Sequence, residues 1–325
     1  MLHLIYSQVA RARRRYYQRR PHLRRRLSAP VISVGNVTVG GSSKTPLAME
    51  IARVLLEMGE RPAILSRGYA RKVPSDGIVV VSDGRGTLVD VDRAGDEPFM
   101  AAGKVPGAAV LVCGSRYTAG RFAESRLGCT VHILDDGFQH FDLLRDVDLL
   151  VAPDLAGDLR TLPAGRLREP LDAARNADAL LVEVVDSGPS AEDGLAAIST
   201  RLGVPLAFGF VRRMTGPSPT QPAFAFTGIA RPERFYADLE KAGWQLAGRR
   251  RFRDHHPYSR RDIDALSEAA KKAGAGVLVT TEKDSARMRH MGPFDTPVID
   301  VALDISLEPR FAAWLADRLR SARSA

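Results

Sequence analysis

A glycine-rich turn followed by Lys44 and Thr45 has the residue types and spacing of a phosphate-binding loop. Small residues let backbone N–H groups approach phosphate oxygens, a lysine reaches the outer phosphates, and a following hydroxyl binds Mg²⁺. We therefore expect nucleotide contacts from Gly40, Gly41, Ser42, Ser43, Lys44 and Thr45. The alternative is a glycine-rich turn that only begins a helix, with Lys44 exposed to solvent.

Ser43 departs from the strict loop pattern, which has glycine immediately before the lysine. If the backbone there needs a positive φ, an L-residue such as serine costs about 1 kcal/mol. The sequence leaves open whether Ser43 weakens nucleotide binding.

Two acids directly follow an apolar run and predict a metal site. Asp135 and Asp136 come after residues 130–134. A carboxylate at the C-terminal end of a parallel strand faces the crevice where ligands bind, and phosphoryl transfer needs such an acid to hold a metal. We expect Mg²⁺ to be bound by Thr45, Asp135 and Asp136. An Asp-Gly turn, the alternative, explains Asp136 and Gly137 but not the whole group.

The apolar runs predict an α/β fold. Run 31–34, the glycine-rich turn, a helix over 46–58 and run 62–66 form a βαβ unit. Further apolar runs without strict alternation favour a mostly parallel, P-loop NTPase-like sheet with helices on both faces. They lie at 78–81, 109–112, 131–134, 148–151, 179–184 and 205–210. We expect this domain over 30–210, a Pro-rich linker over 211–222, and a smaller α/β domain over 223–325.

The positive charge is concentrated in the N-terminal arm, residues 1–29. The formal net charge is +9, and residues 1–30 contain nine arginines and no acid, so the rest of the chain is neutral in total. Leu2, Ile5, Val9 and Tyr16 interleave with the arginines, which favours a basic amphipathic helix at an anionic membrane surface. Pro21 should interrupt this helix. Nucleic-acid binding, a solvated tail and a helix packed on the protein body are the alternatives.

No apolar run approaches the roughly 18 residues of a spanning helix. Residues 1–6 are too short for the apolar region of a signal peptide, so we expect a retained N-terminus and a cytosolic chain. Two cysteines, Cys113 and Cys129, are too few for a disulfide framework and are expected to be buried.

Eight ordered blocks resemble the tetraacyldisaccharide 4'-kinases, which phosphorylate a lipid A precursor. Each block alone is weak evidence for the family. Eight blocks in the family's order, spread over residues 30 to about 290, make the resemblance specific. They are Gly35–Pro46, Ser66–Tyr69, Gly95–Pro98, Asp135–His140, Leu162–Pro170, Thr227–Ala230, Phe252–His256 and Thr280–Asp284. The chain departs from the family pattern at Ser43 and in its arginine-rich N-terminus, which favours electrostatic adhesion over deep membrane insertion.

The resemblance implies transfer of phosphate from Mg-ATP to the 4'-hydroxyl of an acylated disaccharide 1-phosphate. Lys44 then binds the β- and γ-phosphates, Asp96 matches the family's base, and His255 matches its partner. The alternatives are that Asp96 only caps a helix and that His256 takes the place of His255. The candidate contacts with the lipid substrate, or with the residues that bind it, are Arg67, Tyr69, His140, Arg166 and Glu169. For each of these residues the alternative is a structural salt bridge or a hydrogen bond in the core. We expect a monomer at the cytoplasmic face of the inner membrane, with no nucleic-acid partner.

Two other functions remain open. A different P-loop GTPase or ATPase could use the arginine-rich arm on nucleic acid, although Thr281-Glu282-Lys283-Asp284 lacks the spacing of a GTPase base-reading motif. A non-enzymatic, nucleotide-dependent membrane adaptor would need no base, so Asp96→Ala would leave its function intact. The sequence assigns no role to Thr280–Asp284.

Overall fold

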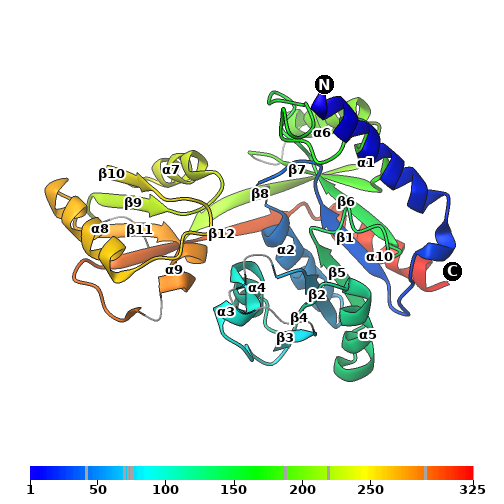
Figure 1. Ribbon diagram of the computed structural model, residues 1–325, viewed down its shortest axis with the longest axis horizontal. Helices are drawn as coiled ribbons and strands as arrows, with labels where there is room; N and C mark the ends of the chain where they lie inside the picture. The colour runs from blue at the N-terminus through cyan, green and yellow to red at the C-terminus, as the bar shows by residue number, and fades with distance from the viewer. Residues whose placement is uncertain are drawn as a thin grey trace.

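The computed structural model describes residues 1–40, 43–68, 71, 73, 77–185, 189–217, 220–288 and 291–324. Its strands form one twelve-stranded sheet in the order β10-β9-β11-β12-β8-β7-β6-β1-β5-β2-β4-β3. Figure 1 shows two lobes, one at each end of this sheet. The strands are β1 Val31–Gly35, β2 Pro62–Ser66, β3 Val79–Asp83, β4 Ala109–Val112, β5 Val131–Asp135, β6 Val147–Val151, β7 Ala179–Glu183, β8 Ala207–Thr215, β9 Ala223–Thr227, β10 Leu246–Arg251, β11 Val277–Thr281 and β12 Val298–Leu307.

The N-terminal lobe is built on parallel pairs at the centre of the sheet. β1 pairs with β5 on one side and with β6 on the other, and the register places Val34 opposite Asp135. Every residue of β1, β2 and β5 is buried, as expected for strands covered on both faces. At the sheet edge, β3 runs antiparallel to β4.

Helices cover both faces of the N-terminal lobe, which confirms the predicted P-loop-like α/β class. One face packs against α2, α4 and α10, and the other against α5 and α6. The helices and 3₁₀ turns of the chain are α1 Leu2–Gln18, η1 Pro21–Leu23, α2 Lys44–Glu57, α3 Val91–Ala94, α4 Asp96–Lys104, α5 Arg116–Leu127, η2 Leu171–Asn176, α6 Pro189–Leu202, α7 Pro232–Lys241, α8 Arg260–Lys272, α9 Glu282–Met288 and α10 Arg310–Ser324.

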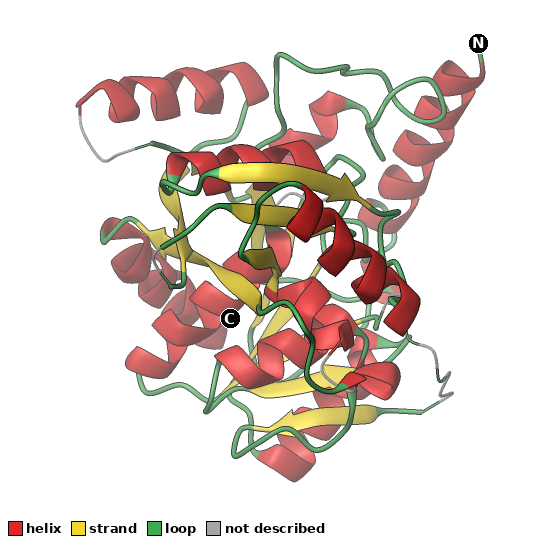
Figure 2. Ribbon diagram, turned by 90° about the vertical axis from the view of Figure 1, so that its left-hand side faces the viewer, coloured by secondary structure: helices red, strands yellow, loops and turns green. Residues whose placement is uncertain are grey.

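The C-terminal lobe repeats the same layering on a smaller scale. β10, β9, β11 and β12 are parallel neighbours. Because side chains alternate along a strand, Ala223 and Ala225 pack beneath α7, while Phe224 and Phe226 pack beneath α8 and α9. Figure 2 views the molecule from the side of this lobe.

Two long strands connect the lobes where we expected a linker. β8 runs to Thr215 and pairs with β12 in antiparallel register from Phe210↔Leu307 to Thr215↔Ala302, so residues 211–215 are strand. The last segment also differs from the expected boundaries. α10 returns to the N-terminal lobe, where Phe311 is fully buried against Phe208. The hydrophobic face of α10 explains this return, because it completes the larger core.

The N-terminal arm forms α1 and then breaks at Pro21, as its sequence predicts. α1 ends at Gln18, and the 3₁₀ turn η1 begins at Pro21. No described helix is both long and apolar enough to cross a membrane. Part of α1 packs on the protein body, because Arg14 is buried and Tyr17 lies 5.8 Å from the Phe141 ring.

Candidate active site

The phosphate-binding turn leaves β1 and enters α2 through strained backbone. Gly40 has a φ of +95°, and Ser43 lies in the left-handed region at φ 61° and ψ 15°. α2 begins at Lys44, so its N-terminal N–H groups border the turn. Gly41 and Ser42 lie outside the described residues. The position that is usually glycine therefore does have a positive φ, and serine occupies it.

Lys44 is held inside the site. Its Nζ donates to Asn36 Oδ1 at 3.1 Å and lies 3.2 Å from Asp136 Oδ1. The side chain is 12% exposed, which differs from the exposed lysine of a simple helix-capping turn. A cation already held by a carboxylate and an amide oxygen is placed to bind an anionic ligand.

Thr45 and Asp135 meet across the end of the central strands. The Thr45 hydroxyl donates to Asp135 Oδ2 at 2.8 Å. Asp135 is buried, and its Oδ1 has no hydrogen-bond partner among the residues that the structure describes. Burial, together with the nearby Glu97 carboxylate, raises the pKa of Asp135 to about 7. A buried carboxylate oxygen without a partner beside a hydroxyl fits Mg²⁺, which takes one or two carboxylates and completes its shell with phosphate and water. The described residues contain no group of three or more His, Cys, Asp or Glu side chains that could hold a metal ion.

Asp136 sits in a different electrostatic environment. Its Oδ2 accepts from Arg168 Nη1 at 2.7 Å, and its backbone is left-handed with φ 59°. Burial alone would raise the pKa of Asp136, but the Lys44 and Arg168 charges outweigh burial and lower it. Asp136 is therefore a carboxylate paired with two cations, and Asp135 is the better placed of the two acids for a metal.

Asp96 and His255 come from different lobes and meet in the structure. Asp96 is the first residue of α4, and His255 follows β10 with a φ of 58°. His255 Nδ1 lies 2.9 Å from Asp96 Oδ2. His256 instead lies 3.3 Å from Asp262 and stacks on Phe252. Of the two adjacent histidines, His255 is thus the one that contacts Asp96.

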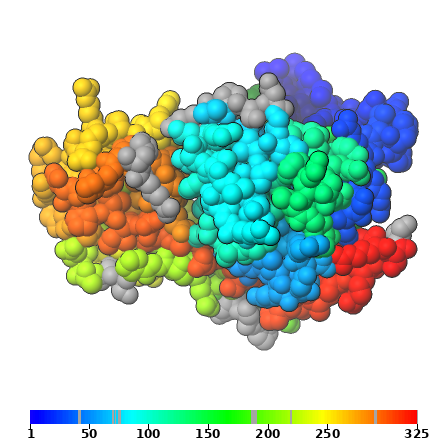
Figure 3. Space-filling view, turned by 90° about the horizontal axis from the view of Figure 1, so that it is seen from below, coloured from blue at the N-terminus to red at the C-terminus, as the bar shows by residue number. Residues whose placement is uncertain are grey.

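The charge around Asp96 keeps it ionised. Burial alone would raise its pKa, but hydrogen bonds from His255 and Arg287, and the Arg287 and Lys283 charges, hold the pKa well below its usual range. Figure 3 shows the segment around α4 lying against the C-terminal lobe, where these partners originate. Lys283 also donates to Glu97 at 3.0 Å, and Lys104 pairs with Glu282.

The candidate substrate contacts are placed differently from one another. Arg67 is exposed, and Tyr69 lies outside the described residues. His140 is buried 3.3 Å from Asp142, and burial outweighs that carboxylate to lower its pKa to about 4. Arg166 donates to Val39 O at 3.0 Å and so braces the phosphate-binding turn.

Glu169 forms a buried structural ion pair, which is the alternative to the expected substrate contact. It is 3% exposed, and both of its carboxylate oxygens accept hydrogen bonds from Arg14. Its Oε1 also accepts from Gln139. The carboxylate of Glu169 is therefore paired with Arg14 of the N-terminal arm. The two residues are 155 positions apart, so the sequence does not predict this pair.

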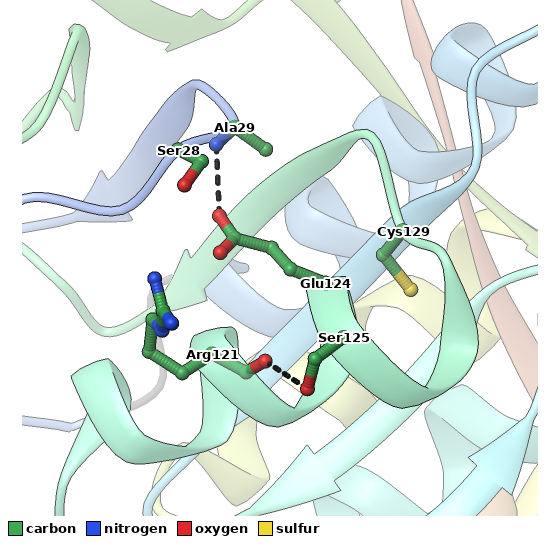
Figure 4. Close-up of a pocket in the computed structure, with 6 residues that line it drawn as sticks. All are labelled: Ser28, Ala29, Arg121, Glu124, Ser125 and Cys129. Carbon is green, nitrogen blue, oxygen red and sulfur yellow. Dashed lines mark hydrogen bonds between the residues drawn. The ribbon is translucent and has the colours of Figure 1, made fainter.

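A surface pocket near the start of β1 does not include any predicted site residue. It is lined by Ser28, Ala29, Arg121, Glu124, Ser125 and Cys129 (Figure 4). Glu124 accepts from the Ala29 N–H at 2.8 Å and lies 3.2 Å from His132. Burial raises the pKa of the Cys129 thiol to about 11, so it remains protonated. Cys113 and Cys129 are both buried and free, as expected.

Three comparisons agree with the geometry. The family model described as tetraacyldisaccharide-1-P 4'-kinase matches residues 1–320. A tetraacyldisaccharide 4'-kinase of Desulfotalea psychrophila is 38% identical over 301 residues, covering 87% of this chain and 85% of that protein. One from Geobacter sulfurreducens is 37% identical over 325 residues, covering 92% and 90%.

A solved structure shares the fold along the whole chain. The crystal structure of LpxK from Aquifex aeolicus in complex with ATP matches with a TM-score of 0.75 and 28% sequence identity, covering 98% of this chain and 100% of that one. The family model and the relatives each cover well over two thirds of the sequence. The chain therefore belongs to the tetraacyldisaccharide-1-phosphate 4'-kinase family.

Proposed function

We propose that this chain transfers the γ-phosphoryl group of ATP to the 4'-hydroxyl of a tetraacyldisaccharide 1-phosphate, a step in lipid A biosynthesis. Family membership supplies the reaction. The observation in the structure that carries the proposal is the Thr45–Asp135 hydrogen bond directly beside Lys44. It joins the phosphate-binding turn to the acid at the end of β5, as a P-loop kinase requires.

Lys44 and the N-terminus of α2 bind the β- and γ-phosphates in this proposal. When the phosphates arrive, Lys44 exchanges its contact with Asp136 for a phosphate oxygen, and Arg168 keeps Asp136 paired. Thr45 and Asp135 would hold Mg²⁺, which neutralises phosphate charge when bound. The residues of this site thereby orient the γ-phosphoryl group and offset its negative charge.

The Asp96–His255 pair accepts the proton of the attacking hydroxyl. The 4'-oxygen bonds to the γ-phosphorus as the bond to the β-phosphate oxygen breaks, and the sugar proton passes to the pair. His255 Nδ1 meets Asp96 Oδ2, and Asp96 Oδ1 receives no hydrogen bond within the described part of the chain. Oδ1 is therefore the oxygen open to a substrate hydroxyl. A positioned base of this kind typically gives a 10²–10⁴-fold gain.

The N-terminal arm brings the enzyme to its lipid substrate. One side of α1 exposes Leu2, Leu4, Ile5 and Val9, each more than half accessible. Arginines follow these residues from Arg11 onward, so apolar insertion and attraction to anionic headgroups act together. These exposed side chains support peripheral binding to a membrane surface, which we propose to be the cytoplasmic face of the inner membrane.

Transfer of ³²P from γ-labelled ATP to a tetraacyldisaccharide 1-phosphate tests the reaction. Wild type should label the lipid in a magnesium-dependent manner. Lys44→Ala should lose at least about 100-fold in kcat, as for other groups that stabilise charge in the transition state. The exposed Lys271 provides the control, because Lys271→Ala should retain full activity. Unlabelled lipid with the folded wild-type protein would refute the proposed reaction.

Vesicle sedimentation tests the membrane role separately. Replacing Leu4, Ile5 and Val9 together by serine should weaken partitioning onto anionic vesicles and leave ATP affinity unchanged. These side chains face solvent, so the triple variant should fold normally. Equal partitioning of the variant and the wild type would contradict the membrane assignment while leaving the kinase assignment intact.

A further inference from the structure

Arg287 in α9 joins a buried carboxylate of the C-terminal lobe to the Asp96–His255 pair. Its Nη1 donates to Asp284 Oδ1 at 3.0 Å and to Gly228 O at 3.4 Å. On its other side, Nε and Nη2 donate to Asp96 Oδ2 at 3.0 and 2.5 Å. The side chain is only 9% exposed, so it is held between the lobes.

Asp284 is a rigid anchor for this arginine. It is fully buried, and its Oδ2 accepts from the hydroxyls of Thr227 at 2.6 Å and Thr281 at 2.8 Å. The Gly228 N–H lies 3.1 Å from the same oxygen. β9 ends at Thr227 and β11 ends at Thr281, so the ends of two neighbouring strands fix the carboxylate. The sequence blocks Thr227–Ala230 and Thr280–Asp284 had no assigned role. Both contribute to holding the Asp284 carboxylate in place.

The same guanidinium also lies against the histidine. Arg287 Nη2 is 3.2 Å from His255 Nδ1, and both atoms approach Asp96 Oδ2. The contacts of Arg287 and His255 with Asp96 cross from the C-terminal lobe to α4 of the N-terminal lobe. The planar guanidinium therefore fixes Asp96 Oδ2 with two N–H groups, and through this oxygen it fixes the imidazole that donates to it, which a lysine cannot do.

We propose that Arg287 is a positioning residue for phosphoryl transfer, anchored by Asp284, which directs Asp96 Oδ1 and His255 toward the substrate hydroxyl when the two lobes are in contact. The inference rests on the proposed kinase function and extends it to the lobe that carries none of the nucleotide-binding residues. Because Arg287 reaches the reaction only through Asp96 and His255, its loss should affect kcat far more than nucleotide binding.

The charged surroundings of Asp96 are consistent with this role. His255, Arg287 and Lys283 face it from the C-terminal lobe, and Glu97 is its neighbour on α4. Lys283 also pairs with Glu97 and lies 3.5 Å from His255 Nε2. In Arg287→Ala, Lys283 still places a positive charge near the Asp96–His255 pair. This variant therefore tests the loss of the hydrogen bonds from Arg287, not the loss of all positive charge.

Steady-state kinetics of Arg287→Ala, Arg287→Lys and Arg249→Ala provide the first test. Arg249 is a half-exposed arginine of the same lobe that pairs with Glu240, so it is a matched control. We expect kcat to fall about 100-fold in Arg287→Ala, comparable to the effect of a 1 Å misplacement, with KM for ATP changed less than threefold. Arg287→Lys should remain impaired by at least tenfold, and Arg249→Ala should match wild type. Ethylguanidine should restore at least tenfold to Arg287→Ala and nothing to Asp96→Asn.

A second readout does not depend on kinase activity. In protein labelled with ¹⁵N-histidine, the Nδ1–H proton of His255 should resonate far downfield in wild type and lose that signal in Arg287→Ala, with thermal unfolding showing that the variant is folded. If wild type failed to phosphorylate the lipid, the proposed function would fall while this resonance still tested the positioning role. A threefold or smaller fall in kcat, absence of rescue by ethylguanidine, or an unchanged His255 resonance would each overturn the inference.

Discussion

Arg14 of the N-terminal arm and Glu169 form a buried ion pair with two parallel hydrogen bonds. The distances are 2.7 Å from Nε to Oε2 and 2.8 Å from Nη2 to Oε1. The Arg14 guanidinium also lies 4.5 Å from the centre of the Phe138 ring. Gln139 donates to Glu169 and to the Asn36 carbonyl, and Asn36 in turn accepts from Lys44. A continuous chain of contacts thus connects the arm to the phosphate-binding turn.

Removing one partner of this pair should be costly. Arg14→Ala leaves Glu169 buried without its cation, and we expect the free energy of unfolding to fall by about 3–5 kcal/mol. Arg11→Ala is the control, because Arg11 pairs with Asp172 on the surface and should cost less than about 1 kcal/mol. Urea unfolding measures both. If Arg14→Ala cost no more than Arg11→Ala, the pair would not anchor the arm.

Relieving the left-handed backbone at Ser43 should stabilise the protein. Glycine adopts a φ of 61° without a Cβ clash, although it gains more freedom in the unfolded chain. We expect Ser43→Gly to raise the free energy of unfolding by about 0.5–1 kcal/mol. Thermal unfolding should show a higher Tm for Ser43→Gly and no gain for Ser43→Ala, which keeps the Cβ. A lower Tm for the glycine variant would mean that the serine side chain stabilises the turn.

Asp135 should make the free enzyme less stable as pH rises. Its pKa is about 7 in the folded protein and 3.8 in its ordinary state. Between these values the folded protein binds more protons than the unfolded chain, so the free energy of unfolding falls with rising pH. Asp135→Asn removes this dependence. The variant should be more stable than wild type at pH 8 and closer to it at pH 4.5, while magnesium-dependent ATP binding is lost.

Urea unfolding of wild type and Asp135→Asn across this pH range measures the difference. Asp317→Asn is the control, because Asp317 is an exposed partner of Arg320. Parallel stability curves for wild type and Asp135→Asn would show that the buried carboxylate is ionised throughout.

Asp96→Asn should separate chemistry from nucleotide binding. The amide keeps the size of the carboxylate but is a poor proton acceptor, so we expect kcat to fall about 10²–10⁴-fold. The nucleotide-binding residues lie on other elements, so KM for ATP should change little. Because the pKa of Asp96 is held well below its usual range, wild type should keep this base ionised at pH 5. Near-normal turnover of Asp96→Asn would show that Asp96 is not the base.

Local patterns were sufficient to predict the parts of the site that lie next to one another in the chain. The glycine-rich turn, Lys44 and Thr45 follow a buried strand, and Asp135 ends another, so parallel pairing of β1 with β5 brings them together. Repeated apolar runs likewise predicted the α/β class. Both inferences depend on short-range periodicity and on the common edge at which parallel strands end.

Contacts between distant segments could not be predicted in this way. Arg14 lies among many similar arginines, and nothing local distinguishes the one that pairs with Glu169. Arg287 was missed for the same reason, although its position three residues after Asp284 places both on one face of α9. The choice between His255 and His256 required the relative position of the two lobes. The apolar periodicity of β8 also could not reveal that it continues as a strand to Thr215.

The antiparallel ladder between β8 and β12 has a consequence for how the molecule would respond to cleavage. Residues 215–217 and 220–222 after β8 are exposed and within reach of a protease. A nick there would not release the C-terminal lobe, because β12 carries the chain back beside β8 and α10 is anchored by Phe311 in the larger core. The two fragments would remain associated, so this site is suited to circular permutation or to reassembly of the enzyme from separately produced halves.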